Sequence, residues 1–144
     1  MKGLFTVLIL LCLSVSSEWL TSIEEAKRIA QEKKQHILLN FSGSDWCAPC
    51  IKMKKEIFSQ EIFTQYADQH LVLVKADFPR LKKNQLDVAQ VKHNEALAER
   101  YNSQGKFPYT LLLDAAGNII KEWDGYKNMT PGEFVSEISK AVHE

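Results

Sequence analysis

The stretch SDWCAPC, residues 44–50, contains two of the three cysteines in this chain of 144 residues. Ala48 and Pro49 separate Cys47 from Cys50. This spacing suits half of a zinc site, a small structural disulfide or a redox-active pair. Each of the three uses requires different surroundings, so the rest of the sequence has to distinguish between them.

The composition favours one globular domain without a strongly charged partner. Hydrophobic residues make up 45% of the chain, which is enough for a sizeable core at this length. Lys and Arg together number 18, as do Asp and Glu, so the formal net charge is zero. A balanced charge gives no indication of binding to nucleic acid.

The first residues, MKGLFTVLILLCLSVSS, have a different character from the rest. A lysine precedes an apolar run that is shorter than the roughly 20 residues needed to span a bilayer. Small residues follow the run, so we predict a signal peptide at residues 1–17 and a mature domain at residues 18–144, with an uncleaved anchor as the alternative. Cleavage removes Cys12 and leaves two cysteines in an oxidising compartment, periplasmic or extracellular.

Helical and extended patterns alternate along the mature chain. Apolar runs predict strands at residues 36–41, 71–77, 109–114 and 118–126, and a glycine-containing turn joins the last two as a hairpin. Four helices are predicted. The first spans residues 21–35 and opens with a capping box from Thr21 to Glu24, and the second spans residues 47–58 with Ile51 facing inward. The third is capped by Asn94 and ends at Tyr101, and the fourth spans residues 130–142 with Thr130 as its N-cap. This order predicts an α/β fold in which a mixed central sheet of about four strands has helices on both faces.

Two of the three uses of the cysteine pair are disfavoured by the residues alone. Structural zinc needs about four ligands, but the chain has no second CxxC pair and its four histidines lie on separate predicted elements. We therefore predict no metal site. A disulfide that closes so short a loop removes little chain entropy, which argues against a purely structural bond.

The place of the pair at the start of a helix favours redox chemistry. Unpaired backbone N–H groups and the positive end of the helix dipole stabilise a thiolate, the attacking species. Cys47 should be exposed there and act as the nucleophile. Cys50 lies one turn further on and is placed to attack a mixed disulfide formed at Cys47. Pro49 lacks an N–H that the first turn would leave unpaired, and it stiffens the loop.

The strand ILLNF, the WCxPC motif opening a helix and the lone proline in KFPYTLLLDAAGN together resemble the thioredoxin family. The likeness extends from about Ser22 to Val142, and FSGSDWC and ADFPR are similar to exported bacterial thioredoxin-like proteins. The resemblance implies a thioredoxin-like fold. It also implies a cis bond before Pro108 that packs against the nucleophile, with the backbone of Phe107 pairing to the substrate chain. Trp46 is expected to form a substrate-facing lip.

The chain departs from the family at one position. With one extra residue allowed in FSGSDWC, the site of a buried family carboxylate falls on Asn40, whose amide cannot act as a base at neutral pH. Asp77 on the neighbouring strand is the expected stand-in base for the Cys50 thiol, and Lys75 is a second candidate.

Neither residue between the cysteines can donate a hydrogen bond or a charge to the thiolate, so the couple is expected to be reducing. We expect a thiol–disulfide oxidoreductase that reduces protein disulfides, needs no cofactor and acts as a monomer. The resemblance implies a membrane thiol–disulfide electron donor as its partner. The alternatives are a disulfide oxidase or isomerase, and a module that binds a partner without catalysis.

Overall fold

A computed structural model describes residues 18–144, and the predicted signal peptide at residues 1–17 lies outside this range. The elements along the chain are α1 (Ile23–Lys33), β1 (His36–Ser42), α2 (Ala48–Met53), a π-helical turn η1 (Lys54–Phe58), α3 (Glu61–His70), β2 (Leu71–Asp77), a 3-10 turn η2 (Lys82–Asn84), α4 (Val88–Tyr101), β3 (Tyr109–Leu113), β4 (Ile119–Asp124) and α5 (Pro131–His143). Within the described residues, no helix combines the length and the apolar character needed to cross a membrane.

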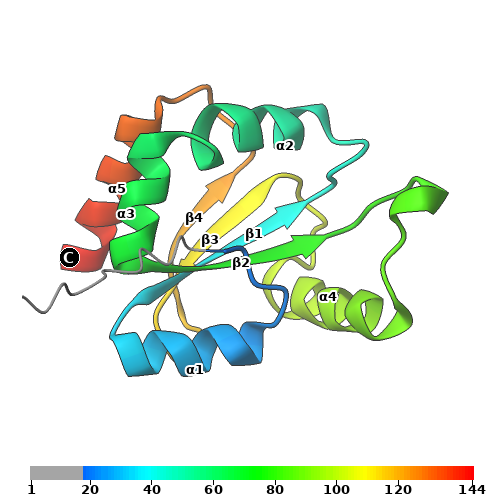
Figure 1. The fold of residues 1–144 in the computed structure, drawn as a ribbon, viewed down its shortest axis with the longest axis horizontal. Helices are drawn as coiled ribbons and strands as arrows, with labels where there is room; N and C mark the ends of the chain where they lie inside the picture. Colours follow the sequence, from blue (N-terminus) through cyan, green and yellow to red (C-terminus); the bar gives the residue numbers. More distant parts are fainter. Residues whose placement is uncertain (1–17) are drawn as a thin grey trace, which may run out of the picture.

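The strands form one mixed sheet in the order β2-β1-β3-β4 (Figure 1). β1 runs parallel to β2 and antiparallel to β3, and the β3–β4 hairpin completes the sheet. The predicted mixed sheet of about four strands is confirmed.

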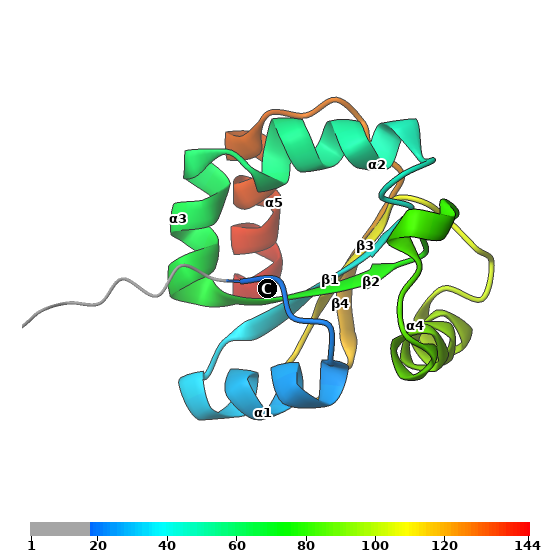
Figure 2. The same ribbon diagram turned by 45° about the vertical axis from the view of Figure 1, so that its right-hand side comes forward.

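Helices cover both faces of the sheet, as the sequence predicts. Figure 2 shows α1 and α4 on one side and α2, α3 and α5 on the other. Because successive side chains of a strand point to opposite faces, β1 supplies both cores. Its Ile37, Leu39 and Phe41 pack in the core with α1 and α4, whereas Leu38 packs in the core with α3 and α5. By the same alternation Asn40 lies on the face that α2 covers.

The residues before α1 extend the sheet by a short bridge. Leu20 lies parallel to β2: its N–H donates to the carbonyl of Leu73 at 2.8 Å, and its carbonyl accepts from the N–H of Lys75 at 2.9 Å. Trp19 packs edge-on against Phe58, with ring centroids 5.0 Å apart. The sequence patterns did not predict this bridge.

Two of the predicted helix starts are wrong. Ser22, not Thr21, caps α1, and its hydroxyl accepts the N–H of Glu25. α4 begins after Asp87, and Asn94 lies buried in the middle of the helix rather than at its N-terminus. The predicted capping box of α5 at Thr130 and Glu133 is confirmed.

Candidate active site

The cysteine pair lies where β1 passes into α2. After Ser42 the chain turns at Gly43, whose carbonyl accepts the N–H of Cys47 at 2.9 Å. A Cβ atom at Gly43 would overlap the indole ring of Trp46, so only glycine allows this close approach. Cys47 is the N-cap of α2 and forms a disulfide with Cys50, with 5.2 Å between their Cα atoms.

The disulfide is covered rather than exposed. Cys47 and Cys50 each have 4% of their surface exposed, so the expected exposure of Cys47 is wrong for this oxidised form. The reason is that the Cys47 sulfur folds back over the first turn, where it is bonded to Cys50 and accepts the backbone N–H of Cys50 at 3.3 Å. Ala48 and Pro49 form the exposed side of the loop.

The three predicted substrate-contacting residues, Trp46, Phe107 and Pro108, lie around this junction. Trp46 is half-buried; its Nε1–H donates to the carbonyl of Phe78 at 2.7 Å, and its ring meets that of Phe107 edge-on at 5.4 Å between centroids. The bond between Phe107 and the buried Pro108 is cis. The structure thus places Trp46 beside the residue that precedes Pro108.

Asp45 connects this junction to the loop that follows β2. Its carboxylate accepts the backbone N–H groups of Arg80 and Leu81, both at 2.9 Å, and the Asn84 side-chain amide at 3.0 Å. These hydrogen bonds, that of the Arg80 N–H above all, lower the pKa of Asp45 below its ordinary value. Sequence patterns missed Asp45 and Arg80, since they lie 35 residues apart. The one available signal was an acid next to the Trp-Cys pair.

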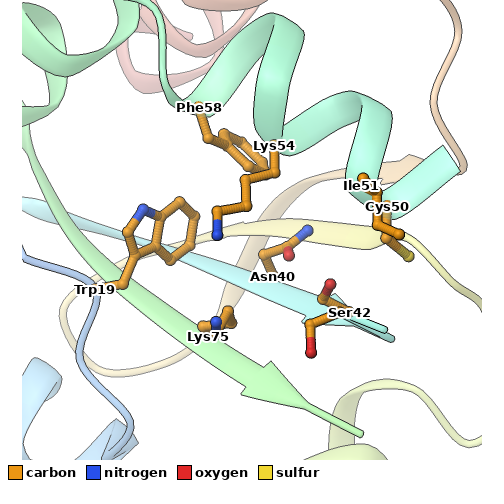
Figure 3. Close-up of a pocket in the computed structure, with 9 residues that line it drawn as sticks. Trp19, Asn40, Ser42, Cys50, Ile51, Lys54, Phe58 and Lys75 are labelled. Carbon is orange, nitrogen blue, oxygen red and sulfur yellow. The ribbon is translucent and has the colours of Figure 1, made fainter. Parts of the chain in front are cut away.

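A cavity of about 250 Å³ opens beside Cys50 (Figure 3). Asn40, Lys54 and Lys75 line it together with Trp19, and Figure 3 shows the Lys54 side chain extending between Trp19 and Asn40. The cavity also borders Ile51, which is 48% exposed, so its predicted inward position is wrong.

The residues expected to assist Cys50 divide between two places. Asn40 is buried and its side-chain N–H donates to the Thr110 hydroxyl at 3.0 Å. Lys75 is the register partner of Asn40 and lines the same cavity. Asp77 instead accepts the backbone N–H of Ser44 at 2.9 Å and its hydroxyl at 2.6 Å, and it is not among the residues that line the cavity. The cavity beside Cys50 is therefore lined by two lysines and not by Asp77.

Within residues 18–144, no group of three or more His, Cys, Asp or Glu side chains is arranged to hold a metal ion. The arrangement that the structure does supply is a strand, a tight glycine turn and a disulfide at the first turn of a helix. This arrangement holds one disulfide that reduction can open and oxidation can close.

Comparisons with known proteins agree with this site. Residues 23–141 match the family model described as a thioredoxin-like domain. The chain is 33% identical over 121 residues to disulfide bond reductase DsbH of Chlamydia pneumoniae, covering 84% of this chain and 70% of that protein. It is 28% identical over 117 residues to thioredoxin-related protein DsbJ of Chlamydia pneumoniae, of which it spans only 33%.

Solved structures extend the likeness. A structure of DsbH oxidoreductase superposes with a TM-score of 0.80 at 29% identity, covering 99% of this chain and 95% of that chain. A thioredoxin from Thermus thermophilus superposes with a TM-score of 0.59 at 18% identity, covering 83% and 82% of the two chains, and supports the fold alone.

Proposed function

This chain belongs to the thioredoxin-like family and is a thiol–disulfide oxidoreductase, and we propose that it works as a reductase of protein disulfides. The observation that carries the proposal is the Cys47–Cys50 pair at the N-terminus of α2, where the side chains of the intervening Ala48 and Pro49 offer no donor to a thiolate. The relative named as a disulfide bond reductase supports this direction.

The proposed cycle uses both cysteines in turn. The Cys47 thiolate attacks one sulfur of a substrate disulfide, and the other substrate sulfur leaves as a thiolate and takes up a proton. The Cys50 thiolate then attacks the Cys47 sulfur, which releases the second substrate thiolate and forms the internal disulfide. Two electrons pass to the substrate, so an external dithiol must return two electrons before the next cycle.

The residues around the pair support reduction rather than oxidation. The strongest oxidants of this chemistry are those whose reduced form is stabilised most. Here the Cys47 sulfur accepts one backbone N–H, from Cys50, and the two intervening side chains have no polar donor. The lack of a polar side-chain donor between the cysteines leaves the thiolate without the extra stabilisation of a strong oxidant, which supports a reducing couple.

The substrate side of the site is proposed to be formed by Trp46 and Phe107, with the buried Pro108 beneath them. The contact between the Trp46 and Phe107 rings joins the segment before Cys47 to the segment before β3, which supports a continuous lip. On this basis a substrate chain lies along Phe107 with its disulfide at Cys47.

We further propose that the protein is exported, that it acts as a monomer and that a membrane thiol–disulfide protein reloads it. The pattern of residues 1–17 and the Dsb names of the relatives support export. A reductase outside the cytoplasm has no soluble reductant at hand, which is why an electron donor in the membrane is required.

The reduction potential of the Cys47–Cys50 couple, equilibrated against glutathione, tests the direction. We expect a value below about −200 mV, in the range of glutaredoxins and thioredoxin. A value near about −120 mV, typical of a strong oxidant, would replace the reductase with an oxidase.

A further inference from the structure

A basic turn follows β2 at the edge of the candidate site. Residues 79–86, which we call the basic turn, read PRLKKNQL and contain Arg80, Lys82 and Lys83 but no Asp or Glu. In Figure 1 this green segment projects beyond the carboxyl end of β2, at the end of the sheet where α2 begins. All three cations are exposed.

The basic turn is fixed against the residues that precede Cys47. Asp45 accepts three hydrogen bonds from Arg80, Leu81 and Asn84, as described above. Trp46 adds a fourth bond, from its indole N–H to the carbonyl at the start of the loop. Asp45 and Trp46 lie within two positions of Cys47, so these bonds hold the backbone of the basic turn close to the cysteine loop.

One of the cations reaches the lip itself. The guanidinium carbon of Arg80 lies 3.7 Å from the centre of a Trp46 ring, in the geometry of a cation–π contact. Trp46 in turn meets Phe107. Arg80, Trp46 and Phe107 therefore form one continuous row from the basic turn to the proposed substrate strand.

The positive charge of the turn is not cancelled by ion pairs. The three ion pairs within residues 18–144 join Arg28 to Glu32, Lys106 to Asp124 and Lys121 to Glu137, and none involves the basic turn. Asp45, Asp77 and Asp87 lie next to the turn and keep their negative charges, because the donors to their carboxylates are neutral groups of the turn, of Ser44 and of Gln90. None of the three forms an ion pair with Arg80, Lys82 or Lys83 within residues 18–144.

We propose that the basic turn docks an acidic segment next to the disulfide of a protein substrate. The inference rests on the proposed reductase function and adds a substrate class to it. Charge complementarity speeds encounter and suppresses wrong partners, and it weakens as salt screens the charges. Leu81 is 48% exposed among the cations and offers an apolar contact to the same segment.

Two synthetic peptides test the proposal. Both contain one intramolecular disulfide in the same sequence, flanked by three Glu residues in one and by three Lys residues in the other. Single-turnover reduction by the pre-reduced full mature chain is followed by stopped flow. At low ionic strength we expect the acidic peptide to react roughly tenfold faster than the basic one. In 1 M NaCl, where the Debye length is about 3 Å, the ratio should fall to about one.

Variants locate the preference. Lys82→Gln/Lys83→Gln should lower the acidic-to-basic rate ratio, and Lys82→Glu/Lys83→Glu should invert it. The matched control, Lys33→Gln/Lys34→Gln, removes the same charge at the end of α1, next to the start of β1 and so at the opposite end of that strand. Its ratio should equal that of the wild type.

Each outcome has a separate meaning. Failure to reduce either peptide would refute the reductase function itself. Reduction of both peptides at equal rates at low salt would overturn the docking proposal and leave the function intact. An equal drop in the ratio for the 82/83 variant and the 33/34 control would also overturn it, because net charge rather than the basic turn would then be responsible.

Discussion

Replacement of Asn40 by Asp should speed the second chemical step, the attack of Cys50 on the mixed disulfide. Asn40 is buried, lines the cavity beside Cys50 and has an amide that cannot accept a proton at neutral pH. The substitution keeps the shape of the side chain. The Thr110 hydroxyl, which now accepts the amide N–H at 3.0 Å, can rotate to donate to the new carboxylate.

The size of the effect follows from the population of the attacking species. An ordinary thiol with a pKa of about 8.5 is about 3% thiolate at pH 7, so a base that removes its proton can speed attack by at most about 30-fold there. Cys50 has 4% of its surface exposed, and burial favours the neutral thiol, so the largest possible gain in rate is higher than about 30-fold. The gain should shrink as the pH rises and vanish once wild-type Cys50 is fully ionised.

Stopped-flow measurement of mixed-disulfide release between pH 6 and 9 tests whether Asn40 limits the rate of the second step. The Asn40→Asp variant should be faster near neutrality and equal to the wild type at the alkaline end. Equal rates at every pH would refute the reasoning and show that the proton of Cys50 already has an acceptor. Two further variants would then distinguish the causes: slower release in Asp77→Asn would identify Asp77 as the acceptor despite its bonds to Ser44, whereas slower release in Lys75→Met would show that the lysine assists by stabilising the Cys50 thiolate electrostatically.

The remaining predictions concern roles, processing and the core. In the reduced protein a small alkylating agent should modify Cys47 before Cys50. The Cys50→Ser variant should accumulate mixed disulfides with substrates, whereas Cys47→Ser should not. If Cys50→Ser forms no trapped covalent complex and partner binding is lost, the result would favour a non-catalytic binding module. Intact mass of the protein from its native compartment should place the N-terminus near Glu18, and a retained first segment would contradict export. Phe134→Ala should lower the free energy of unfolding in urea by about 3–5 kcal/mol because the ring is fully buried, whereas the exposed Ile62→Ala should change it by less than about 0.5 kcal/mol.

Much of the fold could be predicted from local patterns. The run from Leu71 to Asp77 is apolar enough to indicate a strand at the bounds observed, and the capping box at Thr130 starts α5 where the structure has it. These signals depend on neighbours in the sequence alone. The WCxPC motif correctly predicted the junction between β1 and α2 for the same reason, since the strand, the turn and the helix follow one another within a few residues.

The errors occurred where a side chain is used by a distant part of the chain. Asn94 has the chemistry of an N-cap, but its side-chain N–H donates to the carbonyl of Asp77 at 2.9 Å and secures α4 to the end of β2. Asp87, seven positions earlier, caps the helix instead. Asp45 likewise gives no local pattern, because its three donors come from a loop more than thirty residues away. Contacts of this kind require knowledge of the sheet order before they can be assigned.

The bridge between Leu20 and β2 has a consequence for the protein's solubility. β2 is an outer strand of the sheet, and the unpaired backbone groups of such a strand form a template on which a second chain can add as another strand. Leu20 occupies the N–H of Lys75 and the carbonyl of Leu73, in the middle of that edge. The segment between the predicted cleavage site and α1 thus covers part of the β2 edge through a single β-bridge. We expect a chain trimmed past Leu20 to keep its cysteines and its core and yet to become prone to edge-to-edge self-association, which size-exclusion chromatography of the trimmed chain would detect.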